Sequence, residues 1–290
     1  MTEGIAFVDK PAGWTSHDVV AKSRGLLGTK RVGHAGTLDP DATGLLVLGV
    51  GRATRLLTFL SGLDKTYTGE AVLGVATASL DASGEVTGTW DMAGVTLGQV
   101  RAAAVGLAGD IDQVPPMVSA KKIAGRRLHE LAREGVEVER PPVRVHVARF
   151  DVGEPTAPCV FPITVTCSSG TYVRSLAADL GTALGGGAHL RNLRRLSVGP
   201  FDVDEAVPLD QLGPDRVLPP LTAFRGQNPV VVDDEAAAAV RHGAVLPLDR
   251  LGVGSDEPGP WPVVDGGGSL LAVYLPHKPG TAKPGLVLAP

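Results

Sequence analysis

Apolar positions follow two different periods along the first 200 residues of this 290-residue chain. Alternating or uninterrupted apolar positions are typical of strands, and they predict strands at 4–9, 44–50, 65–75, 143–152 and 160–167. Helical spacing and end signals predict helices at 15–28, 96–109 and 171–185. We expect helix caps at Ser16, Thr96 and Thr171, whose hydroxyls can accept hydrogen bonds from the first turn.

The order of these elements separates groups of strands by helices without a repeating strand–helix unit, which favours an α+β fold. We expect a mixed, mostly antiparallel sheet in a large domain over residues 1–225. Proline pairs bound residues 115–142, so we interpret this segment, with its basic stretch GRRLHELAREG predicted as a helix, as an insertion. Residues 226–290 are rich in Gly, Pro, Val and Asp and predict a small β domain.

The net charge of −4 argues at first against binding to nucleic acid, because phosphate contacts need basic surface. The acidity is confined to the C-terminal part. Residues 1–200 carry 21 Lys and Arg against 19 Asp and Glu, whereas residues 201–290 carry 6 against 12. Eight basic side chains stand against four acidic ones between residues 119 and 149. A solvated helix face and a phosphate-binding surface both explain such a run.

Few side chains in the sequence could hold a metal or a cofactor. Cys159 and Cys167 lack the spacing of a zinc site, and GVGRATR matches no nucleotide-binding pattern. Ser16, His17 and Asp18 are consecutive at a helix start and cannot converge as a catalytic triad. We therefore expect no metal and no cofactor, so that side chains must perform any chemistry. The chain start shows no signal peptide and no apolar run of membrane length, so we expect a cytoplasmic protein without membrane contact.

The segment GHAGTLDPDATG, residues 33–44, places Asp39 in a turn of restricted flexibility. Pro40 biases the preceding residue toward extended or turn conformations, and glycines permit close approach of the backbone. An ordinary Asp-Pro turn and an aimed catalytic carboxylate both fit these residues. One histidine with two aspartates is too small a set of ligands to indicate zinc.

Four segments together resemble one family in order and spacing: DKPAGWTSHDVV at 9–20, RVGHAGTLDPDATGLLVLGVGRATR at 31–55, KTYTGEAVLGVATASLDASG at 65–84, and SSGTYVRSLAADLG at 168–181. The family is the TruB type of bacterial tRNA pseudouridine 55 synthases, and the resemblance covers about residues 5–200. It implies isomerisation of a T-loop uridine: the bond from ribose C1′ to N1 breaks, the base rotates, and C5 is joined to C1′.

The resemblance implies a role for each matching residue. Asp39 is the catalytic carboxylate, acting either as a nucleophile on C1′ or as a base that forms a glycal. Arg174 pairs with Asp39 and lowers its pKa, while Tyr67 stacks on the target base and lies near C5. His34 helps to extract the nucleotide from its stack. The pocket-shaping positions are Lys10, Tyr172 and Leu193.

The resemblance also implies partners and domains. The insertion is a thumb that closes over the T stem-loop of tRNA, with phosphate contacts from Lys121, Lys122, Arg126 and Arg127, and we expect Arg191, Arg194 and Arg195 to extend that surface. The C-terminal β domain corresponds to a PUA-like domain, although its acidity departs from an RNA-binding pattern. A second departure is Ser79, where the family usually has threonine. We expect a monomer that needs no protein partner.

Two alternatives belong to other functional classes. One is a chaperone that mainly folds tRNA, an activity that the family is thought to combine with catalysis. The other is a relative that acts on a different RNA with the help of a guide RNA. The presence of Asp39, Tyr67 and Arg174 together favours an enzyme, and the compact chain without a lysine-rich extension favours one that works alone.

Overall fold

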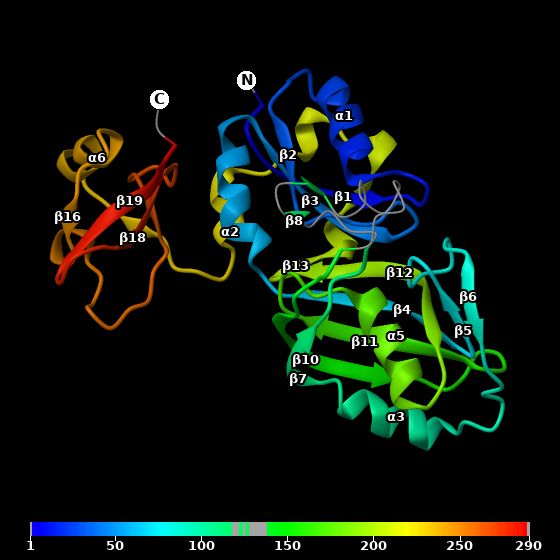
Figure 1. The fold of residues 1–290 in the computed structure, drawn as a ribbon. Coiled ribbons are helices and arrows are strands. Elements are labelled where there is room, and N and C mark those ends of the chain that lie inside the picture. The colour runs from blue at the N-terminus through cyan, green and yellow to red at the C-terminus, as the bar shows by residue number, and fades with distance from the viewer. Residues whose placement is uncertain (1, 118–121, 124–125, 128–137, 289–290) are drawn as a thin grey trace.

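The computed structural model describes residues 2–117, 122–123, 126–127 and 138–288. Within these ranges a ten-stranded sheet forms the centre, and a separate five-stranded sheet lies at the C-terminal end (Figure 1). The main sheet has the order β14, β1, β3, β12, β4, β11, β10, β7, with β2 paired to β3 and β13 to β12. Its strands are β1 (Gly4–Lys10), β2 (Val32–Ala35), β3 (Thr43–Val50), β4 (Lys65–Leu73), β7 (Gly109–Gln113), β10 (Val143–Val152), β11 (Val160–Cys167), β12 (Ala188–Val198), β13 (Phe201–Asp202) and β14 (Val207–Pro208).

The main sheet is mixed and mostly antiparallel. Strand β1 runs parallel to β14, and β3 runs parallel to β12. The other pairs in this sheet are antiparallel. The predicted α+β fold is therefore confirmed.

Strand β4 lies between β12 and β11 and shows the clearest alternation in the sheet. Its odd-numbered residues, from Lys65 to Leu73, are buried and its even-numbered residues are partly exposed. Because successive side chains of a strand point to opposite faces, Lys65 and Tyr67 must share one face. The predicted strand over 65–75 ends at Leu73, and Val75 begins the hairpin of β5 (Val75–Thr77) and β6 (Val86–Thr89).

The helices differ from the prediction mainly at their first residues. Helix α1 (Ser16–Leu26) is capped by Thr15 and not by Ser16, because Thr15 and Asp18 form a reciprocal capping box. Helix α5 (Val173–Ala183) begins after Tyr172, which makes no side-chain cap, so the predicted Thr171 cap is wrong. The predicted Thr96 cap of α3 (Leu97–Val105) is confirmed. The remaining helices within the described ranges are α2 (Leu57–Ser61), α6 (Asp234–Arg241) and the short 3₁₀ helices Gly51–Leu56, Val203–Glu205, Leu209–Gln211, Pro214–Arg216, Pro220–Phe224 and Asp249–Leu251.

The predicted insertion connects two neighbouring strands. Gln113 at the end of β7 pairs with Val143 at the start of β10, so residues 114–142 leave and re-enter the sheet at adjacent points. Arg140 donates a hydrogen bond of 3.0 Å to the carbonyl oxygen of Pro115, which closes the base of the loop. Strands β8 (Lys122–Ile123) and β9 (Arg126–Arg127) form a small antiparallel pair within it. The helix predicted over 125–135 is therefore wrong for Arg126 and Arg127, and most of that stretch lies outside the described residues.

The C-terminal sheet has the order β15, β17, β18, β19, β16. It lies beside α2, at the opposite end of the molecule from α3 (Figure 1). Its residues Val264, Val273 and Leu286 join a hydrophobic cluster with Phe7 and Phe224, which ties this sheet to the main one. Its strands are β15 (Val230–Val231), β16 (Leu246–Pro247), β17 (Trp261–Val264), β18 (Leu270–Pro276) and β19 (Thr281–Val287).

None of the helices in the described part of the chain combines the length and the apolar character needed to cross a membrane.

Gly44 allows β3 and β12 to approach at the point where they pair. Its φ angle is +101°, and a Cβ atom at this position would lie 2.2 Å from the carbonyl oxygen of Arg195. Gly44 pairs with Arg195 in the parallel register that joins the two strands. A larger residue must therefore distort the backbone on which the interior of the main sheet is built.

We expect Gly44→Ala to lower the free energy of unfolding by roughly 2–4 kcal/mol, because backbone strain and a steric clash act together. Chemical denaturation measures the change. Gly25→Ala is the matched control: Gly25 lies in α1, and a Cβ atom there meets nothing within 4 Å. The control is expected to gain about 0.5–1 kcal/mol from improved helix propensity. An equal effect of both variants would contradict this account of Gly44.

Candidate active site

Asp39 lies in the turn between β2 and β3, and its two neighbours in the chain are held by the segment 10–16. The hydroxyl of Ser16 accepts a hydrogen bond of 2.9 Å from the Leu38 amide and donates one of 3.1 Å to the Leu38 carbonyl. On the other side, the carbonyl of Pro40 accepts hydrogen bonds from Lys10 Nζ at 2.8 Å and from the Gly13 amide at 3.0 Å. Asp39 is therefore fixed from both directions.

Lys10 is fully buried and acts within the scaffold of this turn. Besides Pro40, its ammonium group donates to the carbonyls of Pro11 at 3.0 Å and Trp14 at 2.5 Å. Burial lowers the pKa of Lys10 from 10.5 to about 8, and the neighbouring Asp41 and Asp39 oppose that shift. All three hydrogen bonds end on main-chain oxygens, so the lysine supports the turn without occupying the space in front of Asp39.

Arg174 binds Asp39 through two atoms. It is the second residue of α5. Its Nε lies 2.9 Å from Oδ2 of Asp39, and its Nη2 donates to Oδ1 at 3.2 Å. The arginine side chain is 5% exposed and the aspartate side chain is 40% exposed, so the cation is the buried partner and the carboxylate faces the solvent side. The predicted pairing of these two residues, 135 positions apart, is present.

Two further groups hold the arginine, and sequence reasoning missed both of them. Nη1 of Arg174 donates to the carbonyl of Ser79 at 2.7 Å and lies 3.4 Å from Oδ2 of Asp81. The other oxygen of Asp81 accepts hydrogen bonds of 2.6 Å from the hydroxyls of Ser79 and Ser83. The signal was the segment SLDASG itself, where an acidic residue stands between two serines.

The two influences on the Asp39 carboxyl have opposite signs. Partial burial raises the pKa of Asp39 above its ordinary value of 3.8, and the Arg174 guanidinium opposes that rise without cancelling it. The predicted lowering of this pKa by Arg174 is therefore present, but it is smaller than the rise caused by desolvation, which the sequence does not indicate.

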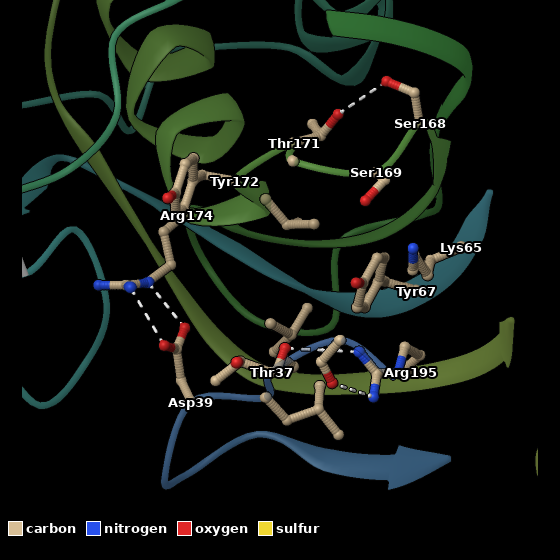
Figure 2. A pocket seen from close by; sticks show the side chains of 15 residues that line it. Thr37, Asp39, Lys65, Tyr67, Ser168, Ser169, Thr171, Tyr172, Arg174 and Arg195 are labelled. Carbon is tan, nitrogen blue, oxygen red and sulfur yellow. Dashed lines mark hydrogen bonds and ion pairs between the residues drawn. The ribbon is translucent and has the colours of Figure 1, made fainter. Parts of the chain in front are cut away.

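A cavity of about 260 Å³ opens beside the Asp39–Arg174 pair. Figure 2 shows the pair at one end of the cavity and Lys65 and Tyr67 at the other. Three of its walls were predicted from the sequence: Tyr67, Tyr172 and Leu193. A second cavity of about 420 Å³ shares Asp39, Arg174 and Leu193 with the first and extends toward Asp81 and Asn192.

Tyr67 and Tyr172 reach the cavity from two elements. Tyr67 comes from the buried face of β4 and is 9% exposed. Burial raises its pKa above 10.0, so its hydroxyl is neutral at neutral pH. Tyr172 stands at the start of α5, where Gln113 grips its main chain: the Gln113 amide group donates to the Tyr172 carbonyl at 3.0 Å and accepts from the Tyr172 amide at 2.7 Å.

The floor of the cavity contains two cations that are bound to main-chain oxygens. Arg195 is fully buried and donates to the carbonyls of Leu45 at 2.7 Å, Gly36 at 3.1 Å and Thr37 at 3.4 Å. The expectation that Arg195 extends an outer RNA-binding surface is therefore wrong. Lys65, which sequence reasoning missed, donates to the carbonyls of residues 61 and 63 at 2.6 Å each, and burial lowers its pKa to about 8.

The other two arginines of this group form ion pairs near the surface. Arg194 binds Asp9 through two hydrogen bonds of 2.9 and 2.8 Å, and Arg191 binds Glu70 at 2.7 Å. Both arginine side chains remain about two-fifths exposed.

His34 lies on β2 and is not among the residues that line the first cavity. Its ring packs edge to face against His17, with centroids 5.5 Å apart. Burial lowers the pKa of His34, so its imidazole is neutral at neutral pH.

The last group of predicted site residues lies on the insertion. Lys121 is outside the described residues, and the main chains of Lys122, Arg126 and Arg127 form the β8–β9 pair. Their predicted phosphate contacts stay a prediction.

In the part of the chain that the structure describes, no group of three or more His, Cys, Asp or Glu side chains is arranged to hold a metal ion. The expected lack of a cofactor stays a prediction.

Comparison with known proteins identifies the family. Residues 24–173 match the model of the TruB family pseudouridylate synthase N-terminal domain, and residues 174–216 match that of the tRNA pseudouridylate synthase B C-terminal domain. Relatives named tRNA pseudouridine synthase B include one from Arthrobacter sp. (strain FB24), 45% identical over 100% of this chain and 98% of its own length. Another, from Streptomyces coelicolor, is 47% identical over 97% of this chain and 95% of its own length.

A solved structure has a similar fold. The crystal structure of a Cbf5-Nop10-Gar1 complex contains a chain that matches with a TM-score of 0.71 and 26% identity, over 94% of this chain and 78% of that one. The family model matches more than half of the sequence, and the relatives above match nearly all of it. This chain belongs to the TruB family of pseudouridylate synthases.

Proposed function

We propose that this enzyme converts the T-loop uridine at position 55 of tRNA to pseudouridine, with Asp39 as the group that opens the glycosidic bond. The observation that carries the proposal is the two-atom pairing of Asp39 with the buried Arg174 at the edge of a cavity of about 260 Å³. The names of the relatives, which specify tRNA, support the substrate.

Asp39 has two possible roles, and both need its ionised form. As a nucleophile it attacks C1′ while N1 of the uracil leaves, and as a base it removes the 2′ proton so that a glycal forms. The detached uracil then rotates and C5 forms the new bond to C1′. This step breaks the bond between Asp39 and C1′ in the first route and returns the proton from Asp39 to C2′ in the second. The C5 proton is lost while N1 gains one. The product is an isomer of the substrate, so no external oxidant or reductant is needed. The fixed turn supports this reaction because accurate placement of a reacting group lowers the barrier.

The walls of the cavity fit a flat base. Tyr67 can stack on the uracil, and its neutral hydroxyl can donate a hydrogen bond near C5. Tyr172 and Leu193 close the remaining sides. The uridine must leave its stack to bring C1′ to Asp39. We assign His34, on the strand that leads into the Asp39 turn, to the RNA that surrounds the extracted nucleotide.

We further propose that the insertion at 115–142 is a thumb that contacts the T stem-loop. One support is the basic character of the segment. The other is the position where it begins: β7 ends at Gln113, whose side chain is hydrogen-bonded to the main chain of Tyr172 beside the cavity. Domain bounds of 1–225 and 226–290, with a PUA-like C-terminal domain, belong to the same proposal. Asp39, Tyr67 and Arg174 come from one chain, which supports a monomer that works without an obligatory protein partner. A cytoplasmic location is proposed because the names of the relatives specify tRNA as the substrate.

Asp39→Asn is expected to reduce tritium release from a T-arm RNA labelled at uridine C5 by at least about a thousandfold, because the amide can neither attack C1′ nor act as a base. Asp41→Asn changes the next acidic residue of the same turn and is the matched control, with activity expected within about threefold of wild type. Undiminished release by Asp39→Asn would exclude the proposed chemistry.

The pH dependence of single-turnover rates tests the ionised state of Asp39. Activity should fall as the pH drops through the Asp39 pKa, and this acid limb should lie above the ordinary value of 3.8 because burial raises that pKa. Arg174→Met removes the cation that opposes the rise. Its acid limb should therefore move to still higher pH, whereas Arg174→Lys should show a smaller movement. An acid limb that stays in place in Arg174→Met would contradict the assigned electrostatic role.

The salt dependence of tRNA binding tests the thumb. Neutralising Lys121, Arg126 and Arg127 together, each to alanine, should weaken binding and reduce the slope of log K against log salt concentration by about 2, because each phosphate contact releases counterions. A matched triple variant, Arg216→Ala, Arg241→Ala and Arg250→Ala, removes as many exposed cations from the C-terminal part. If the two triple variants bind alike, the insertion does not contact the phosphates.

A further inference from the structure

Strand β12 changes midway the set of residues that it turns toward the interior of the main sheet. Its first inward residues are Ala188 and Leu190, both buried. Simple alternation would turn residues 192 and 194 to the same side. Instead, Leu193 and Arg195 line the first cavity. The alternation therefore shifts by one residue between Leu190 and Leu193.

A β-bulge causes the shift. Arg191 of β12 pairs with Glu70 of β4, and the next pair joins Arg194 to Thr68. Strand β12 thus advances three residues while β4 advances two, which is the definition of a bulge with one extra residue. Because a slip of one residue moves every following side chain to the other face, this bulge decides that Leu193 points inward.

Asn192 occupies the bulge in a left-handed conformation, with a φ angle of +53°. Asparagine tolerates this region better than most residues do, and β-branched residues tolerate it worst. Its Nδ2 donates a hydrogen bond of 2.7 Å to Oε2 of Glu70, the oxygen that also accepts from Arg191 at 2.7 Å. The second carboxylate oxygen of Glu70 accepts from the Thr156 hydroxyl at 3.4 Å. Glu70 thereby fastens two residues of the bulge to β4.

Gly69, the neighbour of Glu70 on β4, leaves space beneath the bulge. A Cβ atom on Gly69 would lie 3.2 Å from Leu190 Cδ1, 3.3 Å from the Arg191 carbonyl oxygen and 3.6 Å from Leu193 Cα. The bulged backbone therefore lies directly against the glycine. Gly69 of β4 and Asn192 of β12 therefore both favour the bulged conformation of β12.

We propose that Asn192 is a positioning residue for catalysis, which places Leu193 against the target base through its left-handed backbone and its hydrogen bond to Glu70. The proposal rests on the proposed function, because it takes Leu193 to contact the uracil. Asn192 itself is exposed and faces the second cavity, so it acts through Leu193 and not on the reacting atoms.

The test compares Asn192→Val and Asn192→Gly, each alone and combined with Leu193→Ala, by kcat and KM for tritium release from T-arm RNA. Asn192→Val disfavours the left-handed backbone and should lower kcat roughly tenfold to a hundredfold, with KM little changed. Asn192→Gly permits that backbone but lacks the hydrogen bond to Glu70, so its kcat should fall by a smaller factor than that of Asn192→Val. In the Leu193→Ala background, Asn192→Val should cause little further loss, because the side chain that it misplaces is already absent.

Asn228→Val is the matched control: Asn228 is an exposed asparagine in the C-terminal part and lines neither cavity. It should keep wild-type kcat. Melting temperatures check that each variant is folded, and Asn192→Ala replaces Asn192→Val if valine prevents folding. Wild-type kcat in a folded Asn192→Val or Asn192→Ala variant, or a loss that multiplies in full with that of Leu193→Ala, would overturn the inference. Absence of release by the wild-type enzyme would instead overturn the proposed function, and this inference with it.

Discussion

The ion pair between Asp39 and Arg174 is the interaction on which the rest of this site depends. A buried guanidinium is costly to remove from water unless its donors are satisfied. Here the arginine is almost fully buried and binds Asp39, Asp81 and the Ser79 carbonyl. Its position at the start of α5 adds an unfavourable interaction with the helix dipole, which the two carboxylates offset. The two contacts from Arg174 also fix the orientation of the Asp39 carboxylate at the edge of the cavity.

The second requirement is a turn that holds Asp39 still. The hydroxyl of Ser16 binds both main-chain groups of Leu38, and Lys10 binds the carbonyl of Pro40. Arg195 adds hydrogen bonds to the carbonyls of Gly36 and Thr37 from below. Buried cations thus serve here mainly as donors to main-chain oxygens. This arrangement reduces the reorganisation of the site that a reaction would require, because the position of Asp39 is established before a substrate binds.

The sequence predicts much of this fold and a smaller part of the site. Alternation in β4 and the apolar run of β3 are local signals, so these strands were found. Resemblance to the family supplied the pairing of Asp39 with Arg174. The burial of Arg195 and the raised pKa of Asp39 depend on packing between distant segments, and no local pattern indicates them. The bulge at Asn192 was not predicted for another reason. It interrupts the alternation by which strands are recognised in a sequence.

The insertion leaves and re-enters the main sheet at adjacent points, so its length can change without disturbing that sheet. Gln113 ends β7 and holds the main chain of Tyr172, two residues before Arg174. The insertion that follows is closed at its base, and lengthening a loop whose ends are already joined adds only a small entropic cost. The segment beyond Pro115 can thus vary in length, whereas Gln113 holds the main chain at the start of α5. Residues can be added to or removed from that segment while the hydrogen bonds between Gln113 and the Tyr172 main chain stay the same.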